Sequence, residues 1–499
     1  MNNIKKIAIV GGGTSGWMTA CALAKILRPE NVEISLIEAP DIPTVGVGEA
    51  TIPQIGLFND MVGFDEKEFI KSTKATFKLG IEFVNWGNQG DSYIHPFGKY
   101  GFDMEGVMFH HYWRRLEEEK LTPSIDDYCL QIVAAKSGKF SHPYRDVPQS
   151  PLSNIQYAYH FDAGLYAKYM RNFATTHGVT RIEGRVVNVE QNSETGFIEK
   201  LLLKDGQGLE ADFFIDCTGF VGLLIEKTLG SDYDDWSEWL PVNSAVAAAC
   251  ESPEDPIPYT RATAHEAGWQ WRIPLQHRLG NGYVYCDKFI DDDQAQLDLL
   301  SRLEGKPLAD PKRLKFKTGM RREVWVKNCL SLGLAAGFME PLESTSIHLV
   351  QSGVSRLMSL FPDMGFNQKE IDYYNQRTRV EYEQIRDFLI LHYKATQRED
   401  TDFWRYVKNM DVPQSLTEKI EMYKENGRIF RQENELFNQT SWFAVMHGQN
   451  IRSERWHPVV DSLPLSEIKS RLQEIHATVA NSCDVMPNHK DYIEKFIGQ

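Results

Sequence analysis

Apolar residues fall in short runs, each followed by a turn that contains glycine, and this pattern predicts buried strands. The first run, Ile4–Val10, precedes a glycine cluster and a longer apolar stretch over Trp17–Leu27, which predicts a helix. A second strand is expected at Glu33–Glu38, where the apolar run ends in an acid. A strand, a helix and a second strand in this order form a βαβ unit, so the pattern predicts an α/β fold with a parallel sheet.

The segment Trp269–Pro274, Trp-Gln-Trp-Arg-Ile-Pro, places two large aromatics one residue apart. Side chains alternate along a strand, so both indoles are expected on one face. Pro274 has no backbone N–H and is expected to end regular pairing. The residues alone leave two interpretations open, which are a rigid aromatic wall beside a ligand and an ordinary core strand.

Size and charge exclude some classes of partner. The chain has 499 residues, enough for one large domain with insertions or for two to three smaller ones. Its net charge of −15 disfavours nucleic acid or an anionic membrane as the main partner. We find no signal peptide, and no apolar run approaches the roughly 18 residues that a membrane span needs.

Cysteine usage indicates the redox environment. The seven cysteines include no CxxC pair and no zinc-type spacing. We therefore expect reduced thiols, a cytoplasmic location and no metal site.

The glycine cluster after the first strand has the spacing of a dinucleotide-binding loop. Gly11 is expected to allow a tight turn, Gly13 to let a pyrophosphate approach the backbone, and Gly16 to let helix and strand pack closely. The helix N-terminus offers unpaired amides to phosphates. Glu38, about 20 residues further on, can accept hydrogen bonds from ribose hydroxyls. The residues expected to bind the cofactor here are Gly11, Gly13, Thr14, Ser15, Gly16 and Glu38.

Two later segments favour FAD over NAD. Phe213–Gly219, with Asp216 at the strand end, resembles the Asp-Gly segment that closes over FAD in the phenol hydroxylase and halogenase superfamily. Asn328–Gly337 is a strand entering a glycine-bounded turn, where such enzymes hold the flavin ring. The alternative for each is an ordinary strand-to-helix turn. No second GxGxxG follows a strand, so reduced FAD is expected from a separate NAD(P)H-dependent flavin reductase, unless nicotinamide binds transiently.

With this flavin framework, Trp269–Pro274 resembles the Trp-x-Trp-x-Ile-Pro signature of the flavin-dependent halogenases, the tryptophan halogenase family, and Gly333–Ile347 resembles their halide segment. The resemblance makes Glu343 the active-site glutamate and gives the backbone amides of Thr345 and Ser346 to the halide. The family often has glycine in place of Ser346. Read from the residues alone, Ser344 or Thr345 caps a helix and Glu343 merely lies near its start. The resemblance also gives flavin contacts to Leu334 and Ile347, and an active-site wall to Trp269, Trp271, Ile273 and Pro274.

Lys78 matches the essential lysine of the family, in the sequence Thr-Phe-Lys-Leu-Gly. Gly46–Pro53 resembles the family's Gly-x-Gly-Glu-Ala-Thr flavin strap, which makes Val47, Glu49 and Ala50 cofactor-binding residues. The residues alone suggest otherwise, since Lys71, Lys74 and Lys78 have a helix-like spacing that usually marks a solvated face.

The substrate region is less defined. His95 and Phe97 follow the family's His-x-Phe pattern at the substrate pocket, although a surface turn is an equal alternative. Ser441–Asn450 lacks the paired tyrosines of the free-tryptophan halogenases. We therefore expect an indole, a phenol or another electron-rich aromatic rather than free tryptophan. Trp442, Phe443, His447 and Trp456 are either pocket or core residues.

The resemblance implies a GxGxxG Rossmann-like fold of the flavin monooxygenase superfamily. Residues 1–360 are expected to form the FAD-binding core, with pocket segments inserted around residues 85–160, and residues 361–499 a helical substrate subdomain. The expected activity is halogenation by reduced FAD, O2 and chloride or bromide, with iodide a further candidate, through hypohalous acid delivered to Lys78. The alternatives are a flavin-dependent aromatic hydroxylase and a degenerate flavin-binding protein. A homodimer is one assembly to test.

Overall fold

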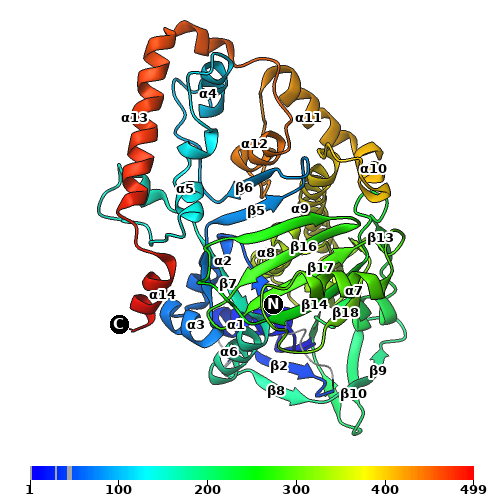
Figure 1. Cartoon of the computed structure of the whole chain (residues 1–499). Coiled ribbons are helices and arrows are strands. Elements are labelled where there is room, and N and C mark those ends of the chain that lie inside the picture. Colours follow the sequence, from blue (N-terminus) through cyan, green and yellow to red (C-terminus); the bar gives the residue numbers. More distant parts are fainter. Residues whose placement is uncertain (1–2, 28–30, 42–47, 499) are drawn as a thin grey trace. The chain divides into compact units, whose positions relative to one another are not determined.

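The computed structural model describes residues 3–27, 31–41 and 48–498 (Figure 1). The chain forms two compact units, each assembled from three separate segments. Unit 1 comprises residues 1–75, 161–243 and 314–383, and unit 2 comprises residues 76–160, 244–313 and 384–499. These two units therefore differ from the two domains, divided at residue 360, that the sequence suggests.

Unit 1 is built on a six-stranded sheet of order β20-β21-β12-β1-β2-β8. All neighbouring strands are parallel except β20 and β21, which form an antiparallel pair. This confirms the predicted α/β class. The strands are β1 (Lys6–Val10), β2 (Glu33–Glu38), β8 (Thr180–Glu183), β12 (Phe213–Asp216), β20 (Trp325–Val326) and β21 (Cys329–Ser331).

The two faces of this sheet are covered by different layers. Ala8 and Val10 face an apolar cluster with Leu201 and Leu203 of a small antiparallel sheet. Ile7 and Ile9 point the other way, as strand alternation requires, toward the side on which α1 packs. The small sheet consists of β9 (Val186–Gln191), β10 (Ile198–Leu203) and β11 (Gly208–Glu210), and the helices of unit 1 are α1 (Thr14–Leu27), α2 (Gln54–Val62), α3 (Glu66–Thr73), α6 (Ala163–Thr176) and α8 (Ser346–Ser359).

The predicted bounds of the first βαβ unit are close to those observed. The second strand is confirmed at Glu33–Glu38, whereas the first begins at Lys6 instead of Ile4. Helix α1 begins at Thr14, three residues before the predicted start. The reason is that its first turn is polar, so apolar periodicity cannot detect it.

Unit 2 contains a seven-stranded sheet of order β18-β14-β17-β16-β15-β5-β6, in which β15 and β5 are parallel. Beside this sheet, β4 (Thr76–Lys78) pairs with the start of β7 (Ala158–Asp162). The seven strands are β5 (Gly80–Val84), β6 (Ser92–Pro96), β14 (Ser244–Cys250), β15 (Thr260–His265), β16 (Gly268–Pro274), β17 (Leu279–Tyr285) and β18 (Lys312–Lys315).

Helices cover this sheet and extend beyond it. Helix α7 packs on β14 and β17, α12 packs on β6, and α13 runs beside α4 and α5 (Figure 1). The long helix α9 (Gln368–Lys394) begins in unit 1 and ends in unit 2. The others are α4 (Phe109–Glu118), α5 (Leu130–Lys136), α7 (Asp292–Ser301), α10 (Asp402–Asn409), α11 (Gln414–Asn426), α12 (Gln439–Gly448), α13 (Leu465–Asp484) and α14 (His489–Gly498).

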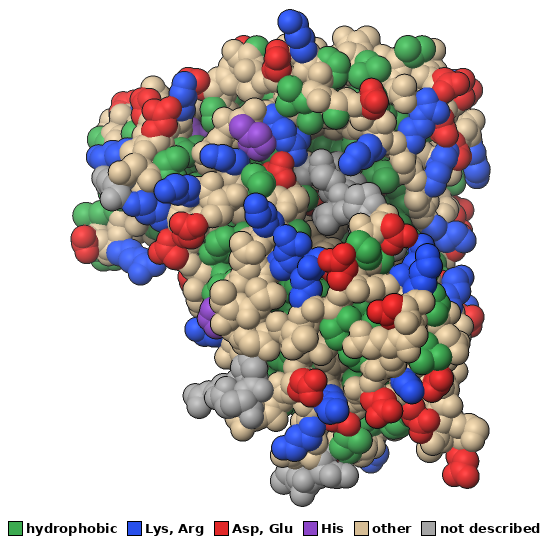
Figure 2. All heavy atoms as spheres, turned by 90° about the horizontal axis from the view of Figure 1, so that it is seen from below, with side chains coloured by type: hydrophobic (Ala, Val, Ile, Leu, Met, Phe, Trp, Pro, Cys, Tyr) green, Lys and Arg blue, Asp and Glu red, His purple; other side chains and the backbone are tan. Residues whose placement is uncertain are grey.

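The surface agrees with the composition. Basic and acidic side chains are interspersed over the face that Figure 2 shows. Among the described helices, none is long and apolar enough to cross a membrane. All seven cysteines lie in the described part of the chain, and they are buried and form no disulfide.

Candidate active site

The glycine loop between β1 and α1 has the geometry expected of a phosphate-binding turn. Gly11 has φ +116°, and a Cβ there would lie 2.2 Å from the carbonyl oxygen of Cys217. A Cβ at Gly16 would lie 1.8 Å from the carbonyl oxygen of Gly11. At Gly13, by contrast, no described atom lies within 4 Å of such a Cβ. The loop therefore packs tightly at Gly11 and Gly16 and is open at Gly13, where a phosphate would approach.

Glu38 is held over this loop by two donors. Its carboxylate accepts hydrogen bonds from Trp17 Nε1 at 3.2 Å and from Arg181 Nε at 2.5 Å. A Cβ at Gly12 would lie 2.0 Å from Glu38 Oε2, so only glycine fits beneath the carboxylate. Each carboxylate oxygen can accept more than one hydrogen bond, which leaves capacity for ribose hydroxyls.

Asp216 has a structural task that the sequence did not indicate. Its buried carboxylate accepts hydrogen bonds from the backbone N–H groups of Thr218, Leu224 and Ile225, and from the Thr218 hydroxyl. These bonds fix the turn that contains Gly219, which has φ +70°. Asp216 therefore sets the shape of this turn.

The expected flavin strap is described only in part. Gly46 and Val47 lie outside the described residues. Glu49 and Ala50 lie on β3 (Gly48–Ala50). Burial raises the pKa of Glu49 from 4.5 to about 7.

The segment that contains Glu343 makes a sharp turn into α8. Glu343 is fully buried at the end of a short 3₁₀ turn, Pro341–Glu343, and Ser344 follows with φ +59°. Thr345 is the N-cap residue of α8, yet its side chain makes no capping hydrogen bond. The interpretation of Thr345 as a side-chain cap is therefore wrong. The first N–H groups of a helix have no partner within it, and α8 begins at Ser346, directly after Thr345.

The glycine loop and the Glu343 segment meet within unit 1. Gly333 has φ +63°, and a Cβ there would lie 2.7 Å from Cβ of Ser15. Leu334 follows in the short turn Gly333–Ala335, and Ile347 is buried in the first turn of α8. The structure thus brings the turn that contains Leu334 and the start of α8 close to the glycine loop.

Lys78 is a buried residue of β4 rather than part of a solvated helical face. Lys71 lies in the last turn of α3, Lys74 follows the helix in a left-handed conformation, and the strand begins at Thr76. The side chain of Lys78 is 0% exposed, and its Nζ lies 5.2 Å from the ring centre of Phe97. A buried lysine with a cation–π contact requires a specific environment, since burial of an ammonium group is costly.

A chain of hydrogen bonds ties β4 to the end of the tryptophan strand. The Thr76 hydroxyl donates to the carbonyl oxygen of Pro274 at 2.7 Å. Thr76 Oγ1 must therefore accept from His160 Nδ1–H at 3.0 Å, and His160 Nε2 accepts from the Thr260 hydroxyl at 2.9 Å. Burial, reinforced by the charge of Lys78, holds the pKa of His160 well below 6.5. The neutral Nδ1–H tautomer is thus fixed.

Trp269 and Trp271 lie on β16 on one face, as alternation predicts, with ring centres 6.2 Å apart. Small residues make room for them on the neighbouring strands. Ala264 lies opposite Trp269, and a Cβ at Gly282 would lie 2.0 Å from the Trp271 ring. Pro274, which pairs with Leu279, is the last residue of β16, so regular pairing ends there as predicted. Ile273 and Pro274 are buried like the tryptophans.

The residues proposed for the substrate pocket lie in packed aromatic surroundings. His95 contacts the ring of Phe388, and Phe97 is half-buried under Lys78. Trp442 Nε1 donates to Glu435 at 2.7 Å. The remaining contacts are Phe443 stacked between His110 and His447, and the Trp456 indole donating to Asp461.

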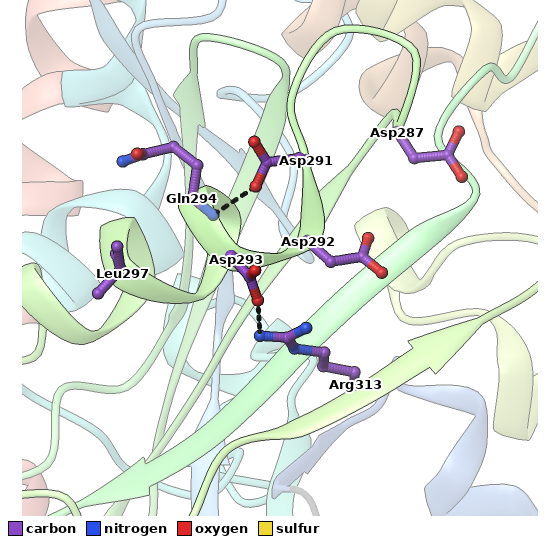
Figure 3. Close-up of a pocket in the computed structure, with 7 residues that line it drawn as sticks. All are labelled: Asp287, Asp291, Asp292, Asp293, Gln294, Leu297 and Arg313. Atoms are coloured by element: carbon purple, nitrogen blue, oxygen red, sulfur yellow. Dashed lines mark hydrogen bonds and ion pairs between the residues drawn. The ribbon is translucent and has the colours of Figure 1, made fainter.

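A surface hollow of about 680 Å³ in unit 2 has no part in this site (Figure 3). Three of the aspartates that line it form hydrogen bonds or an ion pair within the protein. Asp291 caps α7 by accepting from Gln294 N–H at 2.8 Å, and Asp293 pairs with Arg313 at 2.7 Å. Asp292 accepts from Tyr285 at 2.7 Å. The described residues contain no group of His, Cys, Asp and Glu that could hold a metal ion.

Sequence reasoning did not assign a role to Thr76, His160 and His489. Thr76 begins the Lys78 strand, and His160 and His489 each form a hydrogen bond with that strand. The two histidines come from distant segments, so only the folded chain could show these contacts.

Comparison with known proteins assigns the chain to a family. The model of the tryptophan halogenase family matches residues 6–465. Tryptophan 6-halogenase ThaL of Streptomyces albogriseolus is 37% identical over 85% of this chain and 82% of its own length. Tryptophan 7-halogenase RebH of Lentzea aerocolonigenes is 32% identical over 99% of both chains. The chain belongs to the tryptophan halogenase family.

Solved structures agree with this assignment. Xcc4156, a flavin-dependent halogenase from Xanthomonas campestris, has a TM-score of 0.96 and 44% identity over 99% of this chain and 98% of that one. BrvH, a flavin-dependent halogenase from Brevundimonas sp. BAL3, has a TM-score of 0.95 and 42% identity over 99% of both. The chain is thus a flavin-dependent halogenase that uses reduced FAD, O2 and halide on an aromatic substrate, and the hydroxylase alternative is not favoured.

The residues of unit 1 fit an FAD. The backbone at Gly13 is open to a pyrophosphate, whereas a Cβ at Gly11, Gly12 or Gly16 would collide with neighbouring protein atoms. Glu38 presents a carboxylate beside that opening. The loop is therefore shaped for a dinucleotide.

Proposed function

We propose that Lys78 and Glu343 are the catalytic residues of this halogenase. The observation that carries the proposal is the complete burial of both charged side chains in a protein whose family halogenates aromatic rings. Buried ionisable groups in short, sharply turned segments are expensive and are retained where they have a task.

Each residue has a chemical role in this proposal. Reduced FAD, when bound, supplies the two electrons with which O2 and halide give hypohalous acid and water. The backbone amides at Thr345 and Ser346 hold the halide at the start of α8. Lys78 holds the hypohalous acid, as a hydrogen-bond donor or as a haloamine. Glu343 stabilises the cationic ring that forms on halogen transfer and accepts its proton.

The tryptophan wall keeps the two half-reactions apart in this proposal. Trp269 and Trp271 are buried, and Trp86 packs against Trp269 with ring centres 6.4 Å apart. A rigid aromatic layer excludes an aromatic substrate from the flavin, where hydroxylation could compete. Hypohalous acid is small and then reaches Lys78.

The proposed substrate is an indole, a phenol or another electron-rich aromatic. Ser441–Asn450 lacks the paired tyrosines associated with free tryptophan. Xcc4156 and BrvH, at 44% and 42% identity, are described simply as flavin-dependent halogenases, whereas ThaL and RebH are tryptophan halogenases at 37% and 32%. The phenylalanine and tryptophan residues at positions 97, 442, 443 and 456 are candidates for the pocket.

A separate NAD(P)H-dependent flavin reductase supplies the reduced FAD in this proposal. The described chain has one GxGxxG loop after a strand, and it is the loop that fits FAD. A cytoplasmic setting and a homodimer stay predictions of the sequence.

The central experiment replaces Lys78. The protein is incubated with FAD, a flavin reductase, NADH, bromide and indole, and a product carrying one bromine is measured by mass spectrometry. We expect Lys78→Met to lower product formation by about 100-fold or more, because the group that holds the oxidant is lost. Lys71→Met, which changes an exposed lysine of α3, is the matched control and should leave the rate unchanged.

Two results would contradict the proposal. A hydroxylated product that forms without halide would identify a monooxygenase. Bromination by Lys78→Met at the rate of the unmodified protein would remove the role of the lysine.

The role of Glu343 is tested with an isosteric change. Glu343→Gln keeps the shape and the ability to accept a hydrogen bond, but it loses the charge that opposes a cationic ring. We expect kcat to fall by about 100-fold with a small change in KM for indole. An unchanged kcat would show that no carboxylate is needed at this position.

A further inference from the structure

The strand that carries Lys78, β4, is an edge strand within unit 2. Along its outer edge, one backbone N–H group donates to a side chain instead of a neighbouring strand. Among the described strands, β4 pairs only with β7, through Thr76, Phe77 and Lys78. A buried edge must satisfy its outward N–H groups with other partners. The Leu79 N–H donates directly to the carbonyl oxygen of Pro258 at 2.8 Å.

Two residues earlier, a side chain takes the place of that direct bond. The Phe77 N–H donates to His489 Nε2 at 3.1 Å, and His489 Nδ1 lies 2.7 Å from the carbonyl oxygen of Pro256. The segment Pro256–Pro258 thus lies along β4 like a neighbouring strand, and the imidazole of His489 bridges the gap at one position.

The partners fix the tautomer of His489. A backbone N–H can only donate and a carbonyl oxygen can only accept, so Nε2 carries no proton and Nδ1 carries one. His489 is 1% exposed, and burial lowers its pKa to about 4. The imidazole is therefore neutral near pH 7, which is the form that the bridge needs.

The position of His489 is itself fixed by backbone contacts. It is the first residue of α14, and its N–H donates to the carbonyl oxygen of Gly138 at 2.9 Å. Phe140 N–H donates to Pro487 at 3.1 Å, and the Phe140 ring stacks on Phe77 at 4.0 Å. The ring and the backbone of Phe77 are thus held by the same two segments.

From this geometry we infer that His489 is a positioning residue for Lys78, which it places by bridging the backbone of β4 to Pro256. The inference rests on the proposed role of Lys78 as the group that receives hypohalous acid. His489 lies beyond residue 465, where the match to the family ends, so the family pattern does not assign it. Displacement of a reacting group by about 1 Å can cost 10²-fold in rate.

The test compares His489→Leu with His489→Gln. Leucine fills similar space without a hydrogen bond, whereas glutamine can accept from Phe77 with its oxygen and donate to Pro256 with its nitrogen. For His489→Leu we expect kcat for bromination of indole to fall by about 10-fold or more with KM within about twofold, and His489→Gln to recover most of the loss. Tyr492→Phe, on the same helix, keeps its ring and serves as the control.

Two further readouts separate positioning from general destabilisation. Hypohalous acid made but not captured should escape, so His489→Leu should halogenate an external scavenger while the rate of reduced-flavin oxidation stays unchanged. Hydrogen–deuterium exchange at Phe77 should be faster in His489→Leu and slow again in His489→Gln.

The outcomes distinguish this inference from the proposed function. Equal losses of product and flavin oxidation in both His489 variants, or unchanged Phe77 exchange in His489→Leu, would overturn the positioning role. If Lys78→Met still brominates, the proposed function itself fails. If Lys78→Met is inactive while His489→Leu is fully active, only the role of His489 fails.

Discussion

Thr76 has one hydroxyl proton, and the acceptor of that proton determines which ring nitrogen of His160 is protonated. The proton goes to Pro274, so His160 must present Nδ1–H to Thr76. Thr76 is two residues from Lys78, and Pro274 ends the tryptophan strand. The Thr76 hydroxyl therefore links the lysine segment to the tryptophan segment within unit 2.

Removal of this hydroxyl is expected to destabilise the protein. Thr76→Val keeps the shape but leaves the Pro274 carbonyl and the His160 Nδ1–H without their partner in a buried region. We expect a loss of about 1–3 kcal/mol in the free energy of unfolding, measured by denaturant titration. Thr175→Val, at an exposed threonine of α6, should cost less than about 0.5 kcal/mol. An equal, small effect of both changes would argue against the hydrogen-bond chain.

For single residues, the sequence predicted local backbone geometry better than it predicted the surroundings of a side chain. The tasks assigned to Gly11, Gly13 and Gly16 follow from backbone geometry that a short motif specifies, and the structure has the corresponding turn and spaces. The burial of Lys78 could not be predicted from its spacing, because it depends on residues such as Phe97 and His160 that come from other segments.

Among the elements, the loop joining β1 to α1 gives the sharpest prediction. We expect Gly13→Ala to fold normally and to lose FAD affinity, since a Cβ there meets no described atom within 4 Å but occupies the approach to the backbone. Gly16→Ala should instead lower the melting temperature, because its Cβ would lie 1.8 Å from the Gly11 carbonyl oxygen. FAD titration and thermal unfolding measure the two effects. The same behaviour in both variants would contradict this assignment.

Elements with continuous apolar runs were predicted well from the sequence. β2 and the tryptophan strand have nearly the expected bounds, because strand alternation and burial are visible in the residues themselves. Polar element ends were predicted less well. The first turn of α1, which begins at Thr14, was not detected.

For the molecule as a whole, buried histidines are unevenly distributed. Among the described residues, six histidines have a pKa below the ordinary 6.5, chiefly because of burial, and all six belong to unit 2. The values are about 4 for His110 and His489, about 3 for His265 and about 2 for His111, while His160 and His447 are well below 6.5.

Acid is therefore expected to destabilise unit 2. An unfolded histidine binds a proton below pH 6.5, whereas these folded ones do not, so their contribution to stability is complete above that pH and is lost as the pH falls below it. Each should cost about 1 kcal/mol between pH 7 and pH 5.5. The free energy of unfolding, measured by denaturant titration across this range, should fall by several kcal/mol. A value constant within about 1 kcal/mol would refute the prediction.

The arrangement in two units was the least predictable feature. Residues 1–75 and 314–383 belong together although more than two hundred residues separate them. Local patterns report strands and helices, whereas the grouping of segments depends on contacts between distant positions. The sequence therefore showed the α/β class and not the interleaving.

The bond between Phe77 and His489 joins positions 412 residues apart, and this has a consequence for the growing polypeptide. A ribosome that adds about 5–20 residues each second will have exposed the lysine strand for tens of seconds before the histidine emerges. During that time the strand edge is open to chaperones and to other nascent chains. The lysine can reach its final position only late in synthesis, so a prematurely terminated product would carry the motif without the geometry that makes it useful.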